Sequence, residues 1–396
     1  MRYLIIICLA FSACGPTMNE RLPDRAERVR SYLDALVAGN NTPGVQYLVL
    51  DSAGTVFEYA GGWADIARQV PMDTATTLMG YSMSKTVTAA AVLQLVESGQ
   101  IGLDDPVDRY VSFSPYGAGI TVRQLLSHTS GVPNPLPLRW VHLVSRHDAF
   151  DEAAALLAEL ERHPRLAFAP GAKYAYSNLG YWLLGNIVES ASGRSFTSYV
   201  TEHVLRPVGA SPSELAYAIP APAHHARGYL EKYSLFNLAK RFLIDRDVIG
   251  PYEGRWLRIE SHYVNGPAFG GLVGSARGFG KFLQDQIRPQ SVLFKDTGRE
   301  LFYTQQQTAD GTPIALTLGW HMGTLDGARF FYKEGGGGGF HTLMRLYPGP
   351  GLATIVMTNA TGFDVRGCLD TADREFLQLR LCSHGLVKAG GRASRI

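Results

Sequence analysis

The chain has 396 residues, of which 46% are hydrophobic, and its 37 basic and 35 acidic residues leave a formal net charge of +2. This much apolar material can bury a sizeable core, which excludes a disordered protein. The balanced charges give no one-signed field, so we expect no nucleic-acid partner. The four cysteines lack C-x-x-C spacing and no H-E-x-x-H run is present, so we expect no bound metal.

The first 14 residues predict an export signal. Arg2 precedes a short apolar run at residues 3–10, and small residues stand directly before Cys14. The run is too short for a bilayer, which takes about 20 apolar residues to cross. The residues before Cys14 resemble the lipobox of bacterial lipoproteins, in which this cysteine is acylated and becomes the mature N-terminus. We therefore expect export to the bacterial cell envelope, with a lipid anchor in the periplasm and a tether over residues 15–23; a secreted or soluble periplasmic form is the alternative.

Hydrophobic spacing predicts three groups of elements in order along the chain. A helix over residues 24–37 precedes two strands, at 44–50 and 55–60, joined by the turn Asp51-Ser52-Ala53-Gly54. The middle of the chain is mostly helical, with helices expected at 84–98, 122–126, 153–160, 179–190 and 197–205. Strands return at 315–322, 329–333, 340–347 and 352–358, before a helix over 369–381.

These elements predict an α/β fold of the α+β type. The simplest arrangement is one antiparallel sheet built from both chain ends and flanked by helices, with an inserted, mainly helical domain. We expect the sheet domain to hold residues 24–90 and 265–385, and the inserted domain residues 91–264. A C-terminal tail would follow at 386–396, and a cleft would lie between the two domains.

Two segments outside this outline lead to smaller predictions. Residues 229–264, rich in aromatic and basic side chains, favour a surface excursion with a small core of its own. A wall of the substrate cleft or a face resting on the membrane are the alternatives. Cys368 and Cys382 flank the last predicted helix, whose ends would lie roughly 21 Å apart, too far for a disulfide. We therefore expect free thiols.

Ser82-Met83-Ser84-Lys85 is the first segment that could carry chemistry, and it opens an apolar, buried helix. A serine and a lysine three residues apart share one helix face, and a lysine desolvated by burial can serve as the base for the serine. The N-terminal amides of the helix would favour negative charge at Ser82. The alternative without chemistry is a capping serine and a surface lysine.

Two later segments are weaker signals when each is taken alone. Tyr176 and Asn178 stand before an apolar helix and offer a phenol that relays protons and an amide that orients a lysine. Alternatively, Asn178 caps the helix and Tyr176 packs in the core. The third segment, Lys333-Glu334 followed by glycines 335–339, allows close backbone approach to a ligand, or forms a flexible loop between two strands.

Together the three segments resemble the motifs of the serine β-lactamase and penicillin-binding protein superfamily, most closely the esterase branch related to class C β-lactamases. That family orders its motifs as S-x-x-K, Y-x-N and K-T-G or H-x-G. The same order is kept here by Ser82/Lys85, Tyr176/Asn178 and Lys333/Gly335. Stretches at 103–107, 120–131 and 269–273 are also similar to the family, so the resemblance extends over residues 43–359.

The resemblance implies a role for each motif residue. Ser82 forms the acyl-enzyme, Lys85 is its base, and Tyr176 shuttles protons to the leaving group and from the deacylating water. Asn178 fixes Lys85 and a substrate amide. The substrate is a small ester, amide or lactam, and neither a metal nor an organic cofactor is implied.

The third motif supplies the remaining substrate-binding residues, Lys333, Glu334, Gly335 and Gly336. The resemblance implies that Lys333 tunes the proton-shuttling tyrosine, and that the N–H of Gly336 joins that of the nucleophile in an oxyanion hole. Glu334 departs from the family, which places Thr, Ser or a small residue here. Facing the cleft, its charge would repel a substrate carboxylate. Alternatively, it points to the opposite face of its strand from Lys333 and pairs with a cation outside the cleft.

The leading functional prediction is therefore a serine hydrolase acting on small acyl esters. A D-amino-acid peptidase or amidase comes second and a β-lactamase third, while an inactive envelope-binding module is the non-enzymatic alternative. We expect His128 to have a packing role, as the corresponding loop does in the family. Residues 80–84 nearly match the G-x-S-x-G elbow of α/β-hydrolases, but the helical middle of the chain argues against that fold.

Overall fold

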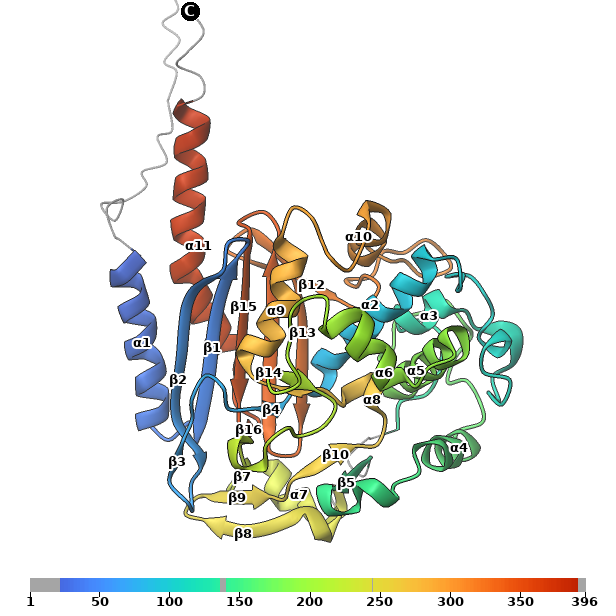
Figure 1. Cartoon of the computed structure of the whole chain (residues 1–396), viewed down its shortest axis with the longest axis horizontal. Coiled ribbons are helices and arrows are strands. Elements are labelled where there is room, and N and C mark those ends of the chain that lie inside the picture. The colour runs from blue at the N-terminus through green and yellow to red at the C-terminus, as the bar shows by residue number, and fades with distance from the viewer. Residues whose placement is uncertain (1–21, 136–139, 244, 391–396) are drawn as a thin grey trace, which may run out of the picture.

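The computed structural model describes residues 22–135, 140–243 and 245–390 (Figure 1). The predicted signal, its Cys14, nearly all of the tether and the last six residues lie outside these ranges. Within them, no helix is long and apolar enough to cross a membrane.

A seven-stranded antiparallel sheet forms the centre of the molecule, in the order β12-β13-β14-β15-β1-β2-β3. Its strands are β1 (Gly44–Asp51), β2 (Thr55–Asp65), β3 (Val70–Pro71), β12 (His321–Leu325), β13 (Ala328–Gly337), β14 (Phe340–Tyr347) and β15 (Leu352–Thr358). The two chain ends meet where β1 pairs with β15, with Val45 opposite Thr358. The predicted sheet from both ends of the chain, and with it the fold class, is confirmed.

Helices cover both faces of this sheet (Figure 1). Helices α1 (Leu22–Ala38) and α11 (Val365–Gly390) lie side by side on one face, and α9 (Ala276–Ile287) lies on the other. Successive side chains of a strand point to opposite faces, so β1 serves both layers. Tyr47 and Val49 pack with α1 and α11, whereas Leu48 and Leu50 pack with α9.

The predicted middle helices are all present, and the central one, α2 (Ser84–Glu97), is buried almost all round. Its neighbours include α5 (Asn178–Ser192), α8 (Pro267–Gly270) and α10 (Asp296–Tyr303). The others are α3 (Val122–Leu126), α4 (Glu152–Arg162) and α6 (Phe196–Val200), which a π-helical turn extends to Leu205. Helix α2 runs across residue 90, where we expected a domain boundary, and one apolar core joins these helices to the sheet. The proposed division into domains stays a prediction.

Residues 229–264 form most of a second, four-stranded sheet. Its strands are β7 (Gly228–Glu231), β8 (Ile249–Glu253), β9 (Trp256–Ile259) and β16 (Ala360–Thr361), with α7 (Leu235–Leu243) beside β7. Leu230, Leu257 and Ile259 make the small separate core that the sequence predicted. Further short strands are β4 (Leu78–Met79), β5 (Val141–Leu143), β6 (Leu215–Ala216), β10 (His262–Val264) and β11 (Val273–Gly274).

Two strand predictions need correction. The strand expected at 315–322 begins only at His321, because Leu316, Leu318 and Trp320 are buried by an irregular segment. In that segment the N–H of Thr317 bonds to the carbonyl of Trp320, and Gly319 has a φ of +115°. The glycine run is not a loop over its whole length, because β13 continues through Gly337 and pairs with β14.

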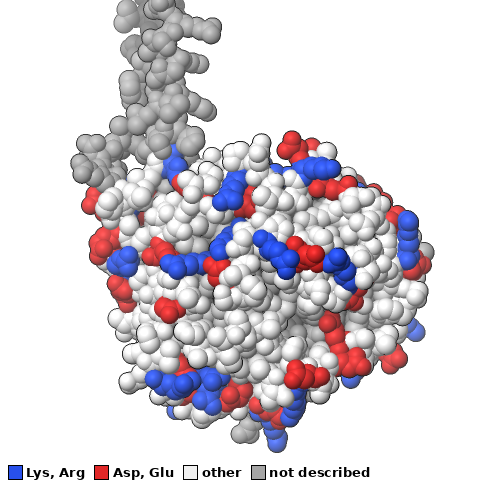
Figure 2. Space-filling view, viewed as in Figure 1, with Lys and Arg blue, Asp and Glu red and all other residues white. Residues whose placement is uncertain are grey.

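Surface charge and cysteines agree with the sequence. Acidic and basic side chains are intermixed over the face shown in Figure 2, without a large patch of one sign. Cys368 is a free, buried thiol on α11, as predicted. The side chain of Cys382 lies outside the described part of the structure.

Candidate active site

Ser82 lies on a single turn of 3₁₀ helix, Tyr81–Met83, that leads from β4 into α2. The turn is packed tightly against its surroundings, because a Cβ at Gly80 would come within 2.2 Å of the Phe279 ring. The predicted alternative of a capping serine is wrong, because no side chain caps this turn or α2.

Lys85, one helical turn after Ser82, is fully buried and makes three contacts through its amine. Nζ lies 3.0 Å from Ser82 Oγ, 2.7 Å from Asn178 Oδ1 and 2.5 Å from the carbonyl oxygen of Phe269. A neutral amine has two protons and one lone pair. Donating its protons to the amide and the carbonyl would leave the lone pair for the Ser82 hydroxyl. The predicted alternative of a surface lysine is wrong.

The protonation state of Lys85 follows from its surroundings. Burial, and then the positive charge of nearby Lys333, hold the pKa of Lys85 well below its usual value. Lys333 is also buried, and burial lowers its pKa to about 7. Its Nζ has no hydrogen-bond partner among the described residues and lies 5.6 Å from the centre of the Tyr176 ring. The site therefore holds two buried amines that can lose their protons.

Tyr176 is the second side chain that contacts the nucleophile, because its hydroxyl lies 2.6 Å from Ser82 Oγ. Burial raises the pKa of Tyr176, although the Ser82 hydrogen bond opposes that rise, so the side chain is a neutral phenol. The ring of buried His128 packs 4.5 Å from that of Tyr176, and its Nδ1 accepts the N–H of Ser177. The expected packing role of His128 is confirmed.

Asn178 is free to hold Lys85 because another residue caps α5. The Oγ of Ser177 accepts the N–H of Gly180, which satisfies the first turn of the helix. The predicted alternative, in which Asn178 itself is the cap, is therefore wrong.

The third motif lies on β13, directly beside the nucleophile. A Cβ at Gly335 would come within 2.2 Å of the carbonyl oxygen of Gly80 and 3.1 Å of Ser82 N, so only glycine lets the strand approach this closely. Gly336 follows in the same strand and, like Ser82, lines a pocket. The two residues of the predicted oxyanion hole thus line the same pocket, and their roles stay a prediction.

The side chain of Glu334 does not lie beside the nucleophile. Its face of β13 also carries Tyr332 and packs with the α11 layer, opposite Lys333. Arg366 of α11 donates to Oε2 at 2.6 Å, and His341 Nε2 lies 2.8 Å from Oε1. Although burial raises it, these hydrogen bonds lower the pKa of Glu334 to about 2. The prediction that Glu334 faces the substrate is wrong, and the alternative, pairing with a cation outside the cleft, is what the structure has.

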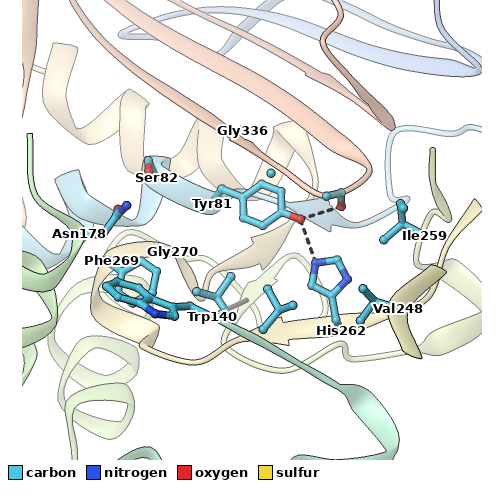
Figure 3. Close-up of a pocket in the computed structure, with 14 residues that line it drawn as sticks. Tyr81, Ser82, Trp140, Asn178, Val248, Ile259, His262, Phe269, Gly270 and Gly336 are labelled. Carbon is cyan, nitrogen blue, oxygen red and sulfur yellow. Dashed lines mark hydrogen bonds between the residues drawn. The ribbon is translucent and has the colours of Figure 1, made fainter. Parts of the chain in front are cut away.

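The pocket in front of Ser82 has about 660 Å³ of empty space, counting the part open to solvent (Figure 3). Its apolar wall is formed by Trp140, Val141, Val248, Ile259, Val264 and Phe269. Three of these come from the 229–264 segment, which is thus also a wall of the cleft. No Lys, Arg, Asp or Glu of the described ranges lines this pocket.

Sequence reasoning missed several groups that complete the site. These are the Phe269 carbonyl on Lys85, the Trp140 wall, and a hydrogen bond between Tyr81 and His262 at the back of the pocket (Figure 3). Only Tyr81, which precedes the nucleophile, and the Phe269-Gly270-Gly271 run had a signal in the sequence. Among the described residues, no group of three or more His, Cys, Asp or Glu side chains could hold a metal ion.

The sheet, the buried central helix and the Ser82–Lys85–Tyr176 contacts define a domain of the β-lactamase and transpeptidase type, within the serine hydrolase superfamily of β-lactamases and penicillin-binding proteins. The Beta-lactamase family model matches residues 29–377, and the chain belongs to this family. The more specific prediction, an esterase branch related to class C, stays a prediction.

Individual relatives are distant. The chain is 26% identical over 309 residues to Penicillin-binding protein 4* of Bacillus subtilis. This match covers 76% of this chain and 64% of that protein. It is 25% identical over 211 residues to Protein flp of Staphylococcus aureus, covering 52% and 41%. The chain thus spans less than two thirds of either relative. The fold is similar to that of D-amino acid amidase from Ochrobactrum anthropi, with a TM-score of 0.74, 19% identity, and coverage of 91% of this chain and all of that one.

Proposed function

We propose that the protein is a serine hydrolase that works through an acyl-enzyme on Ser82. The supporting observation is the chain of contacts from Lys85 Nζ to Ser82 Oγ and on to the Tyr176 hydroxyl, at 3.0 and 2.6 Å. Neutral Lys85 takes the Ser82 proton while Oγ attacks the substrate carbonyl, and the N–H groups of Ser82 and Gly336 stabilise the oxyanion. Tyr176 then passes a proton to the leaving group as the carbonyl carbon releases it. Water then attacks the acyl carbon and gives a proton to the Tyr176 phenolate, while Ser82 Oγ leaves and takes its proton back from Lys85.

The proposed substrate is a small, neutral carboxylic ester. The paired state of Glu334 removes our first reason for preferring esters, since its charge does not face the pocket. The pocket itself offers another reason. Its wall is apolar and the described lining has no cation to receive a carboxylate, whereas an uncharged acyl group would lose little hydration there.

An amidase acting on D-amino-acid amides is the second candidate. Its support is the fold shared with D-amino acid amidase, together with the fact that an amide substrate also lacks a carboxylate. Peptidase substrates ending in D-alanine and β-lactams carry a carboxylate, so we rank them lower. A direct kinetic comparison of these substrate classes can decide between the candidates.

The experiment measures kcat/KM for short-chain p-nitrophenyl esters, D-phenylalanine amide, a D-alanyl peptide and a chromogenic cephalosporin. We expect the esters to have the highest value and Ser82→Ala to lose all turnover. A higher value for the amide would favour the second candidate. No turnover of any substrate, together with no labelling of Ser82 by a fluorophosphonate, would favour the inactive binding module.

Export and lipid attachment at Cys14 are part of the same proposal, supported by the sequence of the first 14 residues. Expressed with its signal in a Gram-negative host, the protein should sediment with membranes. Cys14→Ser should release it into the soluble periplasmic fraction. Sedimentation of the variant with membranes at the level of the unmodified protein would contradict acylation at this residue.

A further inference from the structure

Tyr81, the residue before the nucleophile, has an unusual backbone conformation. Its φ is +45°, in the left-handed region that residues other than glycine rarely adopt. Such a conformation persists only where the surroundings hold it. The side chain is buried, and its hydroxyl donates to the carbonyl oxygen of Gly338 at 2.8 Å and lies 2.9 Å from His262 Nε2 (Figure 3).

His262 is oriented by a hydrogen bond on its other side. Its Nδ1 lies 2.8 Å from the carbonyl oxygen of Glu260, which can only accept, so Nδ1 carries a proton. In the neutral ring, Nε2 is then an acceptor, so the single proton of the Tyr81 hydroxyl is shared between His262 Nε2 and the carbonyl oxygen of Gly338. Burial lowers the pKa of His262, which favours this neutral form. The ring therefore has one orientation in which both nitrogens are used.

Tyr81 also packs directly on the strand that carries the other half of the oxyanion hole. A Cβ at Gly337 would lie 2.5 Å from the Tyr81 ring, so the ring rests on the bare backbone of β13. Gly336 precedes this contact, and Gly338, whose carbonyl oxygen shares the Tyr81 proton with His262, follows it. On its other side, Tyr81 is bonded through the main chain to Ser82. One side chain thus connects the two segments whose N–H groups must act together.

We propose that Tyr81 and His262 are positioning residues that fix the spacing between the N–H groups of Ser82 and Gly336. The inference rests on the proposed function, since it assigns these residues to the oxyanion hole of that reaction. Donors in an oxyanion hole act on charge that develops in the transition state, so a small error in their spacing lowers kcat more than it changes KM.

The test compares Tyr81→Phe, His262→Ala and His262→Gln on a p-nitrophenyl ester. Tyr81→Phe keeps the ring on β13 but loses the hydroxyl, and we expect kcat to fall roughly 10- to 100-fold, up to the loss of one oxyanion donor, with KM within about twofold. His262→Ala should show a similar loss. His262→Gln, whose side-chain oxygen can accept the Tyr81 proton, should recover part of it. Because the two residues act through one hydrogen bond, the Tyr81→Phe/His262→Ala pair should lose little more than Tyr81→Phe alone.

Tyr116→Phe is the matched control. Tyr116 is a buried tyrosine whose hydroxyl donates to the carbonyl oxygen of His163 at 2.8 Å, outside the pocket. It should lose a comparable amount of thermal stability with kcat unchanged. Equal losses of kcat in Tyr81→Phe and Tyr116→Phe, or a rise in KM with kcat unchanged in Tyr81→Phe, would overturn the inference.

Labelling of Ser82 by a fluorophosphonate separates this inference from the function on which it rests. The phosphonyl oxygen occupies the oxyanion position, so Tyr81→Phe should be labelled more slowly than the unmodified protein. If the unmodified protein is not labelled at all, the proposed function fails. If it is labelled and Tyr81→Phe reacts at the same rate, the positioning role fails while the proposed function stands.

Discussion

Two buried polar clusters lie on opposite faces of the same pair of strands. They differ in whether the buried charges have partners of opposite charge. On one face, Lys333 of β13 lies with Lys85 beside the nucleophile, and neither amine contacts a carboxylate among the described residues. On the other face, Arg345 of β14 lies with Asp373 of α11, and both are fully buried.

The Asp373 carboxylate is surrounded by donors. The hydroxyls of Tyr47, Tyr347 and Thr354 donate to it at 2.9, 2.7 and 3.0 Å, and Arg345 lies 3.4 Å away. Burial still raises the pKa of Asp373, and these partners oppose that rise. This cluster joins α11 to three strands of the sheet.

The difference separates two uses of buried charge. A buried ion with its partners in place holds elements together, and removing one partner leaves an uncompensated charge. A buried amine without a counter-charge instead gives up its proton easily, which makes it a base near neutral pH. The fold supplies both from neighbouring strands because successive side chains alternate between faces.

The largest expected effect tests the uncompensated cluster. Lys85→Ala should lower kcat/KM roughly 10³- to 10⁴-fold, since it removes the general base, while the unfolding temperature changes little or rises. In the unmodified protein, the lowered pKa of Lys85 keeps the amine neutral at neutral pH, so activity should fall at the acid end as the amine gains a proton. A rate profile measured from acid to neutral pH, with circular dichroism to check folding, tests both. Activity without an acid limb would contradict the role of Lys85.

The next effect tests the compensated cluster. Asp373→Ala leaves buried Arg345 with only Asp370, at 2.6 Å, and removes the acceptor shared by three hydroxyls. It should lower the free energy of unfolding by about 3–5 kcal/mol. Chemical denaturation measures this loss. Under conditions where the variant is folded, its kcat should stay near that of the unmodified protein. The concentration of active sites for this comparison is measured by labelling Ser82 with a fluorophosphonate. A lower kcat with unchanged stability would mean that the two clusters are not separate in function.

The smallest effect concerns Glu334, which belongs to the same strand as Lys333 but to the paired side. Glu334→Gln should cost about 1 kcal/mol at neutral pH, the amount typical of a partly exposed ion pair. The folded pKa of about 2 lies below the usual value for glutamate, so this stability is present above the usual value and disappears as pH falls toward 2. Urea unfolding of both proteins at several pH values measures it. The ratio of ester to cephalosporin kcat/KM should not change; a shift toward the cephalosporin would place the charge of Glu334 in the cleft after all.

Sequence and structure agree best where a prediction depends on local spacing. Ser82 and Lys85 are one helical turn apart, so their contact followed from helix spacing. The approach of Tyr176 and Asn178 to this pair was predicted only from the resemblance to the family. The partners of Glu334 could not be predicted in this way. Arg366 lies on α11 and reaches β13 only because that helix packs across the sheet, which no spacing along the chain encodes.

The same limit explains the other missed features. Tyr81 and His262 are 181 positions apart, and Phe269 contributes a backbone carbonyl, which any residue type could supply. The strand expected at 315–322 failed for a different reason. Alternating apolar residues indicate burial on one side, and here an irregular segment buries them without a strand.

The pairing of β1 with β15 also sets an order of events for the growing chain. Val45 finds its partner only when Thr358 has been made, so the sheet cannot close until β15 has been synthesised. Until then, one edge of β1 presents unpaired backbone groups, which are prone to join the wrong strand. Pairing between strands so far apart in the sequence is slow, so partly folded states persist longer. A chain truncated before Leu352 would lack β15 and would leave this edge of β1 unpaired. Such N-terminal fragments should therefore aggregate instead of forming a smaller working domain.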